Sequence, residues 1–233
     1  MYLFLKRHAR QCLRSIYRVI QTPGSLVDQR RIQAKYPTLK HNLKTNTDVH
    51  PIIERSLKEY VTYVSRPDMA ISRELAVFLY GLCESIRPQY ILDMGSGFSS
   101  YVFRLYQANA REAVSVTSVD SDARWLKTTE DYLMRQGVST AGGRFWPDFS
   151  LENEHFDLIL HDLGGMETRL NSLPALIGSL SPNGALILDD VHKTSYRRDA
   201  RIVLKQHRVS VYSLVHYTFD GYGRYAWLVT KNR

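Results

Sequence analysis

Residues 91–100 read ILDMGSGFSS, a short apolar run that ends in Asp93 and continues through Gly95 and Gly97. An apolar run that is followed by glycine and serine predicts a buried strand and then a turn into a helix. In open α/β sheets, ligands bind beyond the carboxyl ends of the strands. Glycine allows the backbone to turn sharply and to approach a ligand closely. This stretch therefore predicts an α/β fold with a ligand site at the end of a strand.

Strand and helix patterns alternate along most of the chain, which predicts parallel strands joined by helical crossovers. Two late apolar stretches, joined by Asp220-Gly221, predict a closing antiparallel hairpin with a tight connection. The sequence thus predicts a mainly parallel sheet of about seven strands with a C-terminal antiparallel hairpin. The predicted parallel strands cover residues 90–94, 113–120, 142–147, 155–162 and 184–190, and the predicted helices cover residues 51–64, 69–86, 99 onward, the stretch up to 136, 167–180 and 195–206.

The N-terminal part of the chain is far more basic than the rest. Residues 1–45 contain ten Lys or Arg residues and one acid, Asp28, whereas the remaining residues carry 21 basic and 22 acidic side chains. The first twenty residues predict an amphipathic helix, which could lie on an anionic membrane surface, serve as a cleaved targeting segment, or pack on the domain. We therefore divide the chain into a basic, partly helical N-terminal extension, residues 1–45, and a folded domain, residues 46–233. Residues 22–50 are predicted to form a loose connection.

Composition limits the class of protein. Hydrophobic residues make up 44% of the chain, which is enough to build a core. The two cysteines, Cys12 and Cys83, are too few for a disulfide framework or a zinc site, and they fit a reducing compartment. No apolar run approaches the ~20 residues needed to span a bilayer, and no nucleic-acid-binding module is recognisable. We expect a cytoplasmic protein with peripheral membrane contact through residues 1–20 and no nucleic-acid partner.

A second acid strengthens the prediction of a nucleotide-like ligand. Asp120 ends the next predicted strand, where an acid can bind both hydroxyls of a ribose. A dinucleotide fingerprint would require a third glycine where this chain has Ser100. Ser100, Asp93 and the lack of an evident Tyr-x-x-x-Lys pair disfavour an NAD-linked oxidoreductase, which stays an alternative. A non-catalytic domain that docks through residues 1–45 is the other alternative.

The ordered motifs resemble those of the class I S-adenosylmethionine-dependent methyltransferases over about residues 60–230. Four motifs carry the resemblance: ILDMGSGFSS, VTSVDSDARWL, FDLILHDLGG and LSPNGALILDDV. The sequence looks closest to the small O-methyltransferases of the catechol and caffeoyl-coenzyme A groups, because MAISRELAVFL (69–79) resembles the stretch before their first motif. The resemblance implies a Rossmann-like methyltransferase domain over residues 46–233.

The resemblance also implies a site for S-adenosylmethionine, the methyl donor. Asp93 and Gly95 would hold its amino-acid end, and Asp120 would bind the ribose hydroxyls. The other residues that the resemblance places at the donor are Ser72 near its carboxylate, Ser96, Gly97 and Ser99 in and after the glycine turn, Ser121 near the adenine, and Trp146 in the loop that flanks the adenine.

Three further acids predict a second feature of the site. Asp162 ends one predicted strand, and Asp189 and Asp190 end the next. Three carboxylates at one sheet edge repel one another unless a cation or protons intervene, and oxygen ligands suit Mg²⁺. Metal-dependent O-methyltransferases have an acid and an Asp-Asn pair at these positions, but this chain has Asp190 for the Asn and Gly165 for a catalytic lysine. Alternatively, Asp162 contacts the donor or substrate directly, and Asp189 or Asp190 caps the next helix.

The expected reaction is methyl transfer to an oxygen of a small-molecule or glycan-like acceptor. If no metal binds, a hydroxyl acceptor needs a general base, and histidine titrates near neutral pH. His192 is the first candidate, and His161 and Lys193 are the next. We therefore predict Asp162 and His192 as catalytic residues, with S-adenosylmethionine as cofactor and Mg²⁺ as a candidate metal.

Overall fold

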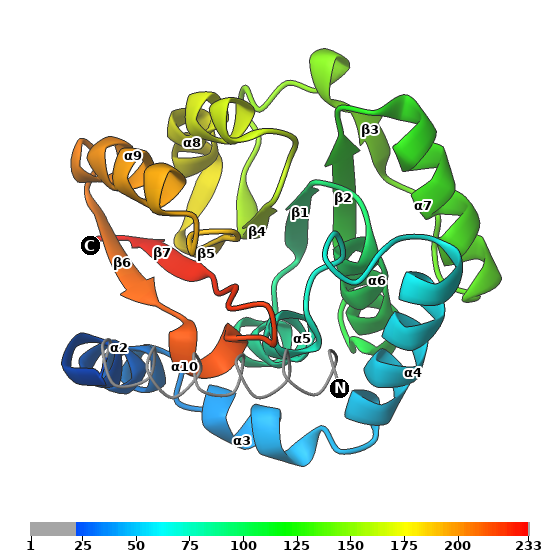
Figure 1. Cartoon of the computed structure of the whole chain (residues 1–233), viewed down its shortest axis with the longest axis horizontal. Coiled ribbons are helices and arrows are strands. Elements are labelled where there is room, and N and C mark those ends of the chain that lie inside the picture. The colour runs from blue at the N-terminus through cyan, green and yellow to red at the C-terminus, as the bar shows by residue number, and fades with distance from the viewer. Residues whose placement is uncertain (1–21, 233) are drawn as a thin grey trace, which may run out of the picture.

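A seven-stranded sheet forms the middle layer of the computed structural model, which describes residues 22–232 (Figure 1). Its strand order is β3-β2-β1-β4-β5-β7-β6, and β7 is antiparallel to both of its neighbours. The α/β fold with a mainly parallel sheet and a closing antiparallel pair is therefore confirmed. The strands are β1 (Tyr90–Met94), β2 (Ser115–Asp120), β3 (Gly143–Phe145), β4 (Phe156–His161), β5 (Leu180–Leu188), β6 (Val209–Ser213) and β7 (Trp227–Lys231).

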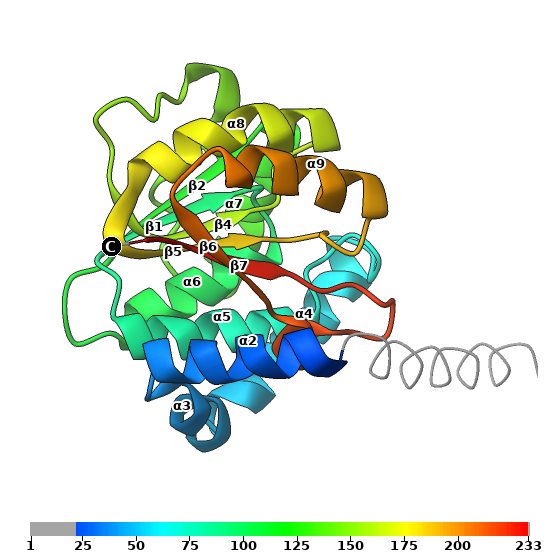
Figure 2. The same ribbon diagram turned by 90° about the vertical axis from the view of Figure 1, so that its left-hand side faces the viewer.

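Helices cover both faces of this sheet (Figure 2). Successive strand residues alternate between two cores, so that Ile91 joins the core under α4 to α7 and Leu92 joins the core under α8 and α9. A sheet buried on both faces explains the nearly continuous apolar runs of its strands. The helices are α2 (Thr22–Lys35), α3 (Leu39–Thr45), α4 (Val49–Tyr63), α5 (Arg73–Ile86), α6 (Phe98–Asn109), α7 (Ala123–Arg135), η1 (Trp146–Asp148), α8 (Met166–Ser179), α9 (Thr194–Lys205) and α10 (Val215–Thr218).

The prediction of a loose connection over residues 22–50 is wrong, because this segment forms α2, α3 and the start of α4. Ile32 and Leu39 are fully buried in the core, and Asp28 Oδ2 accepts a hydrogen bond of 2.9 Å from Ser213 N. A few apolar side chains that find partners on α5 and β6 are enough to order a polar segment. The amphipathic helix predicted for the first twenty residues lies outside the described residues.

The predicted tight turn between the last two strands is also wrong. A longer connection, which contains α10, separates β6 from β7. The connection is folded around the buried Asp220, which accepts hydrogen bonds of 2.8 Å from Tyr222 N and Arg224 N and forms an ion pair of 2.7 Å with Arg224 Nε. Thr218 Oγ1 accepts a further hydrogen bond of 3.0 Å from Ala226 N. Asp220-Gly221 thus belongs to a structured loop rather than to a two-residue turn.

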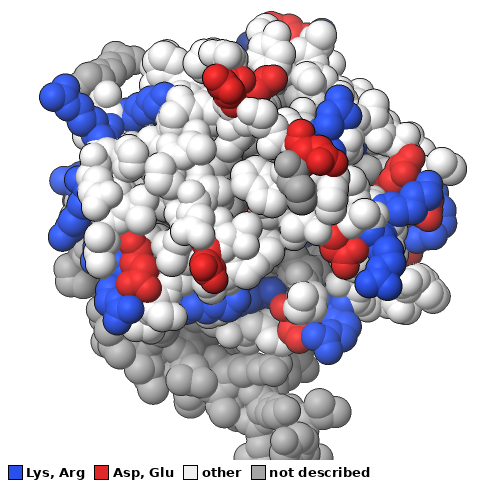
Figure 3. All heavy atoms as spheres, turned by 90° about the horizontal axis from the view of Figure 1, so that it is seen from above, with Lys and Arg blue, Asp and Glu red and all other residues white. Residues whose placement is uncertain are grey.

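The surface of the described residues carries no broad single-sign area on the face seen in Figure 3, where basic and acidic side chains are interspersed. Wide areas of that face carry neither kind of side chain. Within residues 22–232, no helix has the length and apolar character that crossing a membrane requires.

Candidate active site

The turn that follows β1 has a conformation that only glycine adopts easily. Gly95 has φ of +108°, and a Cβ added there would lie 2.6 Å from the carbonyl oxygen of Asp162 at the end of β4. A Cβ added at Gly97 would lie 3.3 Å from the hydroxyl of Tyr60. The turn is therefore enclosed by β4 on one side and by α4 on the other.

Asp93, at the carboxyl end of β1, is fully buried beneath this turn. Its Oδ2 accepts hydrogen bonds from Ser100 Oγ at 2.5 Å and from Ser118 Oγ at 3.0 Å. Its Oδ1 is buried without a hydrogen-bond partner among the described residues. Burial raises the pKa of Asp93 to about 6, although the hydroxyl groups and the nearby Arg104 guanidinium oppose that rise. The free oxygen is available to a ligand that donates a hydrogen bond, such as an amine.

Asp120, at the carboxyl end of β2, accepts hydrogen bonds from the same turn. Its Oδ2 accepts hydrogen bonds from Ser96 N at 2.8 Å and from Ser96 Oγ at 2.9 Å, and its Oδ1 accepts one of 3.0 Å from Asp122 N. Trp125 Nε1 donates a 2.7 Å hydrogen bond to Ser96 O and holds the turn from the α7 side. The two acidic motifs that the sequence singled out therefore meet at one place.

The remaining residues that the sequence predicts at the donor have different surroundings. Ser99 is buried, and its Oγ lies 3.5 Å from Gly95 O. Ser121 is exposed, and its Oγ lies 3.5 Å from the position of a Cβ at Gly164, in the loop after β4. Trp146 is half-buried in η1 and packs against the core under α8 and α9. Ser72 begins α5, where its Oγ accepts a 3.0 Å hydrogen bond from Leu75 N as a helix cap.

Tyr60 is a member of the site that the sequence did not indicate. It comes from α4, and its ring packs against Phe98 at 5.4 Å and against Tyr132 at 4.8 Å between centroids. Burial raises its pKa above the usual range, and the nearby carboxylates of Asp93 and Asp120 add to that rise. The Tyr60 hydroxyl therefore stays protonated beside the turn at Gly97.

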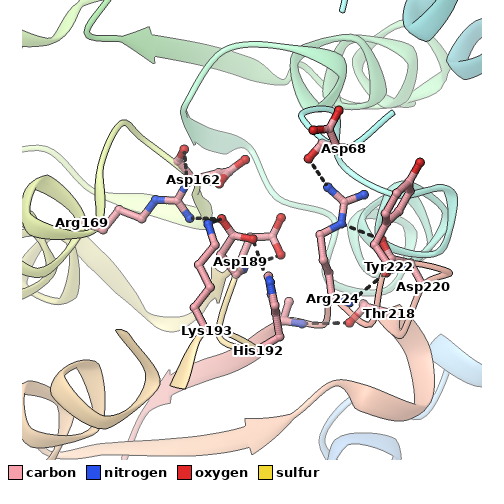
Figure 4. Close-up of polar contacts among 12 residues, drawn as sticks. Asp68, Asp162, Arg169, Asp189, His192, Lys193, Thr218, Asp220, Tyr222 and Arg224 are labelled. Atoms are coloured by element: carbon pink, nitrogen blue, oxygen red, sulfur yellow. Dashed lines mark hydrogen bonds and ion pairs between the residues drawn. The ribbon is translucent and has the colours of Figure 1, made fainter. Parts of the chain in front are cut away.

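The acidic cluster, which we define as Asp162, Asp189 and Asp190, lies at the carboxyl ends of β4 and β5. Arg169 of α8 is buried, forms an ion pair with the Asp162 carboxylate, and places its Nη1 3.3 Å from Asp190 Oδ2 (Figure 4). The same guanidinium donates hydrogen bonds to Asp162 O at 3.0 Å and to Gly164 O at 3.3 Å. None of the sequence motifs singles out this arginine.

Asp190 contacts a second cation and also faces an imidazole. Lys193 Nζ lies 2.6 Å from Asp190 Oδ2, and His192 Nδ1 lies 3.5 Å from Asp190 Oδ1. Burial acts to raise the pKa of Asp190, but the Lys193 ammonium and the Arg169 guanidinium outweigh it and hold that pKa below its usual range. Asp190 is therefore a stable carboxylate that faces three nitrogen-bearing side chains.

Asp189 has the opposite character. It is buried, and its Oδ1 accepts a 2.7 Å hydrogen bond from Asp190 N. Burial, together with the carboxylates of Asp162 and Asp190, raises its pKa to about 8. Burial raises the pKa of Asp162 only to about 6, because Arg169 opposes the rise. Asp189 therefore holds its proton more firmly than Asp162 does.

These residues do not fit the predicted Mg²⁺ site. A magnesium ion requires free oxygen ligands in octahedral geometry, but Asp162 and Asp190 already accept charged hydrogen bonds from Arg169 and Lys193. Among residues 22–232, no group of three or more His, Cys, Asp or Glu side chains is arranged to hold a metal ion. The alternative that Asp189 or Asp190 caps the next helix is also wrong, because α9 begins after Lys193 without a side-chain cap.

The three candidate bases differ in access. His161 is fully buried, its Nε2 lies 3.0 Å from Arg169 O and 3.1 Å from Ser172 Oγ, and burial lowers its pKa to about 4. Lys193 forms an ion pair with Asp190. His192 is half-buried, and burial lowers its pKa, so its imidazole is neutral near pH 7 and can accept a proton.

A second loop faces His192 across the site (Figure 4). Arg224 donates hydrogen bonds to Asp68 O at 3.1 Å and to Ala70 O at 3.0 Å, and so joins the loop before β7 to the loop before α5. Each of these loops carries one large exposed side chain, Tyr222 at 48% and Met69 at 65% exposure. Aromatic and apolar side chains beside a polar site are typical of the walls that hold a small organic molecule.

Comparison with known proteins supports the fold. No protein-family model and no curated protein sequence matches the chain at a significant level. Among solved structures, a Podospora anserina methyltransferase bound to S-adenosylhomocysteine is 13% identical, with 78% of this chain and 88% of that chain covered and a TM-score of 0.62.

Two O-methyltransferases show the same likeness. The enzyme from Bacillus cereus, also bound to S-adenosylhomocysteine, is 17% identical, with 76% of this chain and 88% of that chain covered and a TM-score of 0.61. A protein described as a putative caffeoyl-CoA O-methyltransferase from Staphylococcus aureus is 16% identical, with 81% of this chain and 99% of that chain covered and a TM-score of 0.56. The chain has the fold of the class I S-adenosylmethionine-dependent methyltransferases, and its structure resembles their small O-methyltransferases.

Proposed function

We propose that this protein is an S-adenosylmethionine-dependent methyltransferase that acts on a hydroxyl oxygen of a small-molecule or glycan-like acceptor. One observation carries the proposal: Ser96 of the glycine turn donates hydrogen bonds from both its N–H and its hydroxyl to Asp120 at the end of β2. This contact brings the two motifs of the donor site together. The likeness to methyltransferases with bound S-adenosylhomocysteine supports the same proposal.

The donor site provides a group of the right kind for each part of the donor. Asp93 Oδ1, which is buried without a partner among the described residues, suits the amino group, and the tight turn at Gly95 and Gly97 lets the backbone approach it. The Asp120 carboxylate suits the ribose hydroxyls, since Oδ1 accepts one hydrogen bond from the chain and can accept another. Rotation of the Ser96 hydroxyl toward Thr129 Oγ1, 3.3 Å away, would free a second position on Oδ2. When bound, S-adenosylmethionine supplies an electrophilic methyl group on its sulfonium. Ser72, Ser99, Ser121 and Trp146 keep the donor-side roles that the sequence predicts for them.

The acceptor hydroxyl would lose its proton to His192 as the methyl group is transferred. Asp190 Oδ1, 3.5 Å from His192 Nδ1, would stabilise the resulting imidazolium. Asp162 would line the space between donor and acceptor. The protein contributes little covalent chemistry, since in-line placement of the acceptor is the main requirement of methyl transfer. Replacing His192 by Gln should therefore lower kcat by about 10²-fold or more without changing the affinity for S-adenosylhomocysteine; an unchanged kcat would exclude His192 as the base.

The structure does not favour a nicotinamide enzyme. Ser100, at the position where a dinucleotide fingerprint has its third glycine, donates its hydroxyl to Asp93 Oδ2 and accepts a 3.1 Å hydrogen bond from Gly97 N. A glycine there would remove a buried partner of Asp93. A cytoplasmic location and membrane contact through residues 1–20 stay predictions.

Calorimetric titration with S-adenosylhomocysteine tests the proposal. The wild-type chain should bind one equivalent, and Asp120→Ala should weaken binding by about 10- to 100-fold, because hydrogen bonds to a charged group contribute roughly 1.5–3 kcal/mol. Asp131→Ala is the matched control, since Asp131 is an aspartate of α7 whose side chain is 49% exposed and paired with Lys127. Absence of wild-type binding would contradict the proposal, as would equal losses in the two variants.

A further inference from the structure

Two carboxylates of the acidic cluster, Asp162 and Asp190, are paired with cations of the chain itself. Asp162 is paired with Arg169, and Asp190 contacts both Arg169 and Lys193. Asp189 instead accepts a hydrogen bond from Asp190 N. Two carboxylates that are already in contact with two cations offer a divalent cation little electrostatic attraction.

The Arg169 guanidinium also occupies the position that a bridging ion would need. It contacts the Asp162 carboxylate and Asp190 Oδ2 at the same time, and it donates to the carbonyl oxygens of Asp162 and Gly164. Arg169 is 5% exposed, so these contacts are shielded from water. The planar guanidinium presents five N–H donors in a fixed geometry, which allows one side chain to join several acceptors.

We propose that Arg169 takes the place of a divalent cation between the carboxyl ends of β4 and β5, so that this cluster binds no metal ion. Arg169 is then a positioning residue: it fixes Asp190, which faces His192, and Asp162, which ends β4. Its role in methyl transfer rests on the proposed function. Its exclusion of a metal ion does not, because that follows from charge and contact alone.

Mn²⁺ titration of the full chain near pH 7.5, followed by electron paramagnetic resonance of the free ion, tests this inference. Wild type should show no saturable binding. Arg169→Ala removes the guanidinium and leaves space between the carboxylates, so it should bind Mn²⁺ saturably. Its affinity should be at least about tenfold higher than any residual affinity of wild type. The double variant Arg169→Ala with Asp162→Asn should lose this gain, because one of the two ligands is then neutral.

Two results would overturn the inference. One is saturable Mn²⁺ binding by wild type that Asp162→Asn abolishes, and the other is Mn²⁺ binding by Arg169→Ala that is no tighter than that of wild type. If circular dichroism shows that Arg169→Ala does not fold, the comparison of wild type with Asp162→Asn still decides, since equal and non-saturable titrations support the inference. Failure of S-adenosylhomocysteine to bind, with or without a chelator, would contradict the proposed function but leave the Mn²⁺ result valid.

Discussion

Two groups of acidic side chains end neighbouring strands of one sheet, yet they are stabilised in different ways. At β1 and β2, Asp93 and Asp120 accept hydrogen bonds from serine hydroxyls and backbone N–H groups. At β4 and β5, Asp162 and Asp190 are in contact with Arg169 and Lys193. Neutral partners leave the first pair able to bind a ligand, whereas cationic partners neutralise the second.

The largest expected effect is on the cationic side of this comparison. Arg169→Met removes the guanidinium and leaves two partly buried carboxylates, Asp162 and Asp190, without this partner, which should lower the free energy of unfolding by about 3 kcal/mol. Adding Asp162→Asn should recover part of this loss, because one uncompensated charge is removed. Urea denaturation of the single and double variants measures both effects.

Arg198→Met is the matched control, since Arg198 also forms an ion pair with an aspartate, Asp199, but its side chain is 72% exposed. This control should change stability little, because exposed ion pairs are screened by water. Equal losses in Arg169→Met and Arg198→Met would show that the buried cluster does not depend on its guanidinium.

A smaller effect is expected at Asp93, whose pKa burial raises from 3.8 to about 6. Between these values the folded chain binds more protons than the unfolded chain, so this carboxyl group makes the free energy of unfolding fall as pH rises. Asp93→Asn lacks the titration. The stability of the variant relative to wild type should therefore increase by roughly 2–3 kcal/mol from pH 4 to pH 7.

Denaturant titrations of both proteins across this pH range measure the difference. Asp131→Asn, at an exposed site on α7, is the control and should run parallel to wild type. If the difference in free energy of unfolding between Asp93→Asn and wild type does not change with pH, the pKa of Asp93 is not raised by folding. That result would contradict the burial of Asp93 among neutral hydrogen-bond partners.

The smallest effect concerns the turn that joins the two groups. Gly95→Ala places a Cβ 2.6 Å from Asp162 O at φ of +108°, whereas Gly137→Ala has φ of +69° and no neighbouring atom within 4 Å. Both variants carry backbone strain, but only in Gly95→Ala does the new Cβ also clash with a neighbouring atom. The free energy of unfolding should therefore fall by about 1–2 kcal/mol more in Gly95→Ala than in Gly137→Ala. Equal thermal midpoints for the two variants would mean that β4 does not constrain the turn.

The alternation of strands and helices along the chain, and the placement of Asp93 and Asp120 at strand ends, could be predicted because both depend on local patterns. An apolar run that ends in an acid fixes where Asp93 and Asp120 lie, since parallel strands bring their carboxyl ends to one edge. The Mg²⁺ prediction is not supported by the structure, and the reason is that charge compensation is not local. Arg169 lies in the helix after β4, and nothing in the neighbouring sequence marks it as the partner of Asp162 and Asp190.

Other features of the structure were not predicted for the same reason, which is that they depend on long-range contacts. Tyr60 belongs to an ordinary apolar stripe of α4, and only tertiary packing brings its hydroxyl near Gly97. Residues 22–45 are polar and basic, yet α2 and α3 are ordered because Ile32 and Leu39 find partners in the core. The connection before β7 is tied to a distant part of the chain by Arg224, which donates hydrogen bonds to Asp68 O and Ala70 O. Each of these features depends on contacts that short sequence patterns do not contain.

A crystal structure of the wild-type chain with S-adenosylhomocysteine, grown in the presence of Mg²⁺, tests both sides of the comparison at once. We predict the ribose hydroxyls on the Asp120 carboxylate, the amino-acid end at Gly95 and Gly97, and the Arg169 guanidinium still between Asp162 and Asp190. A nucleoside bound elsewhere, or a metal ion between these carboxylates with Arg169 displaced, would contradict the account.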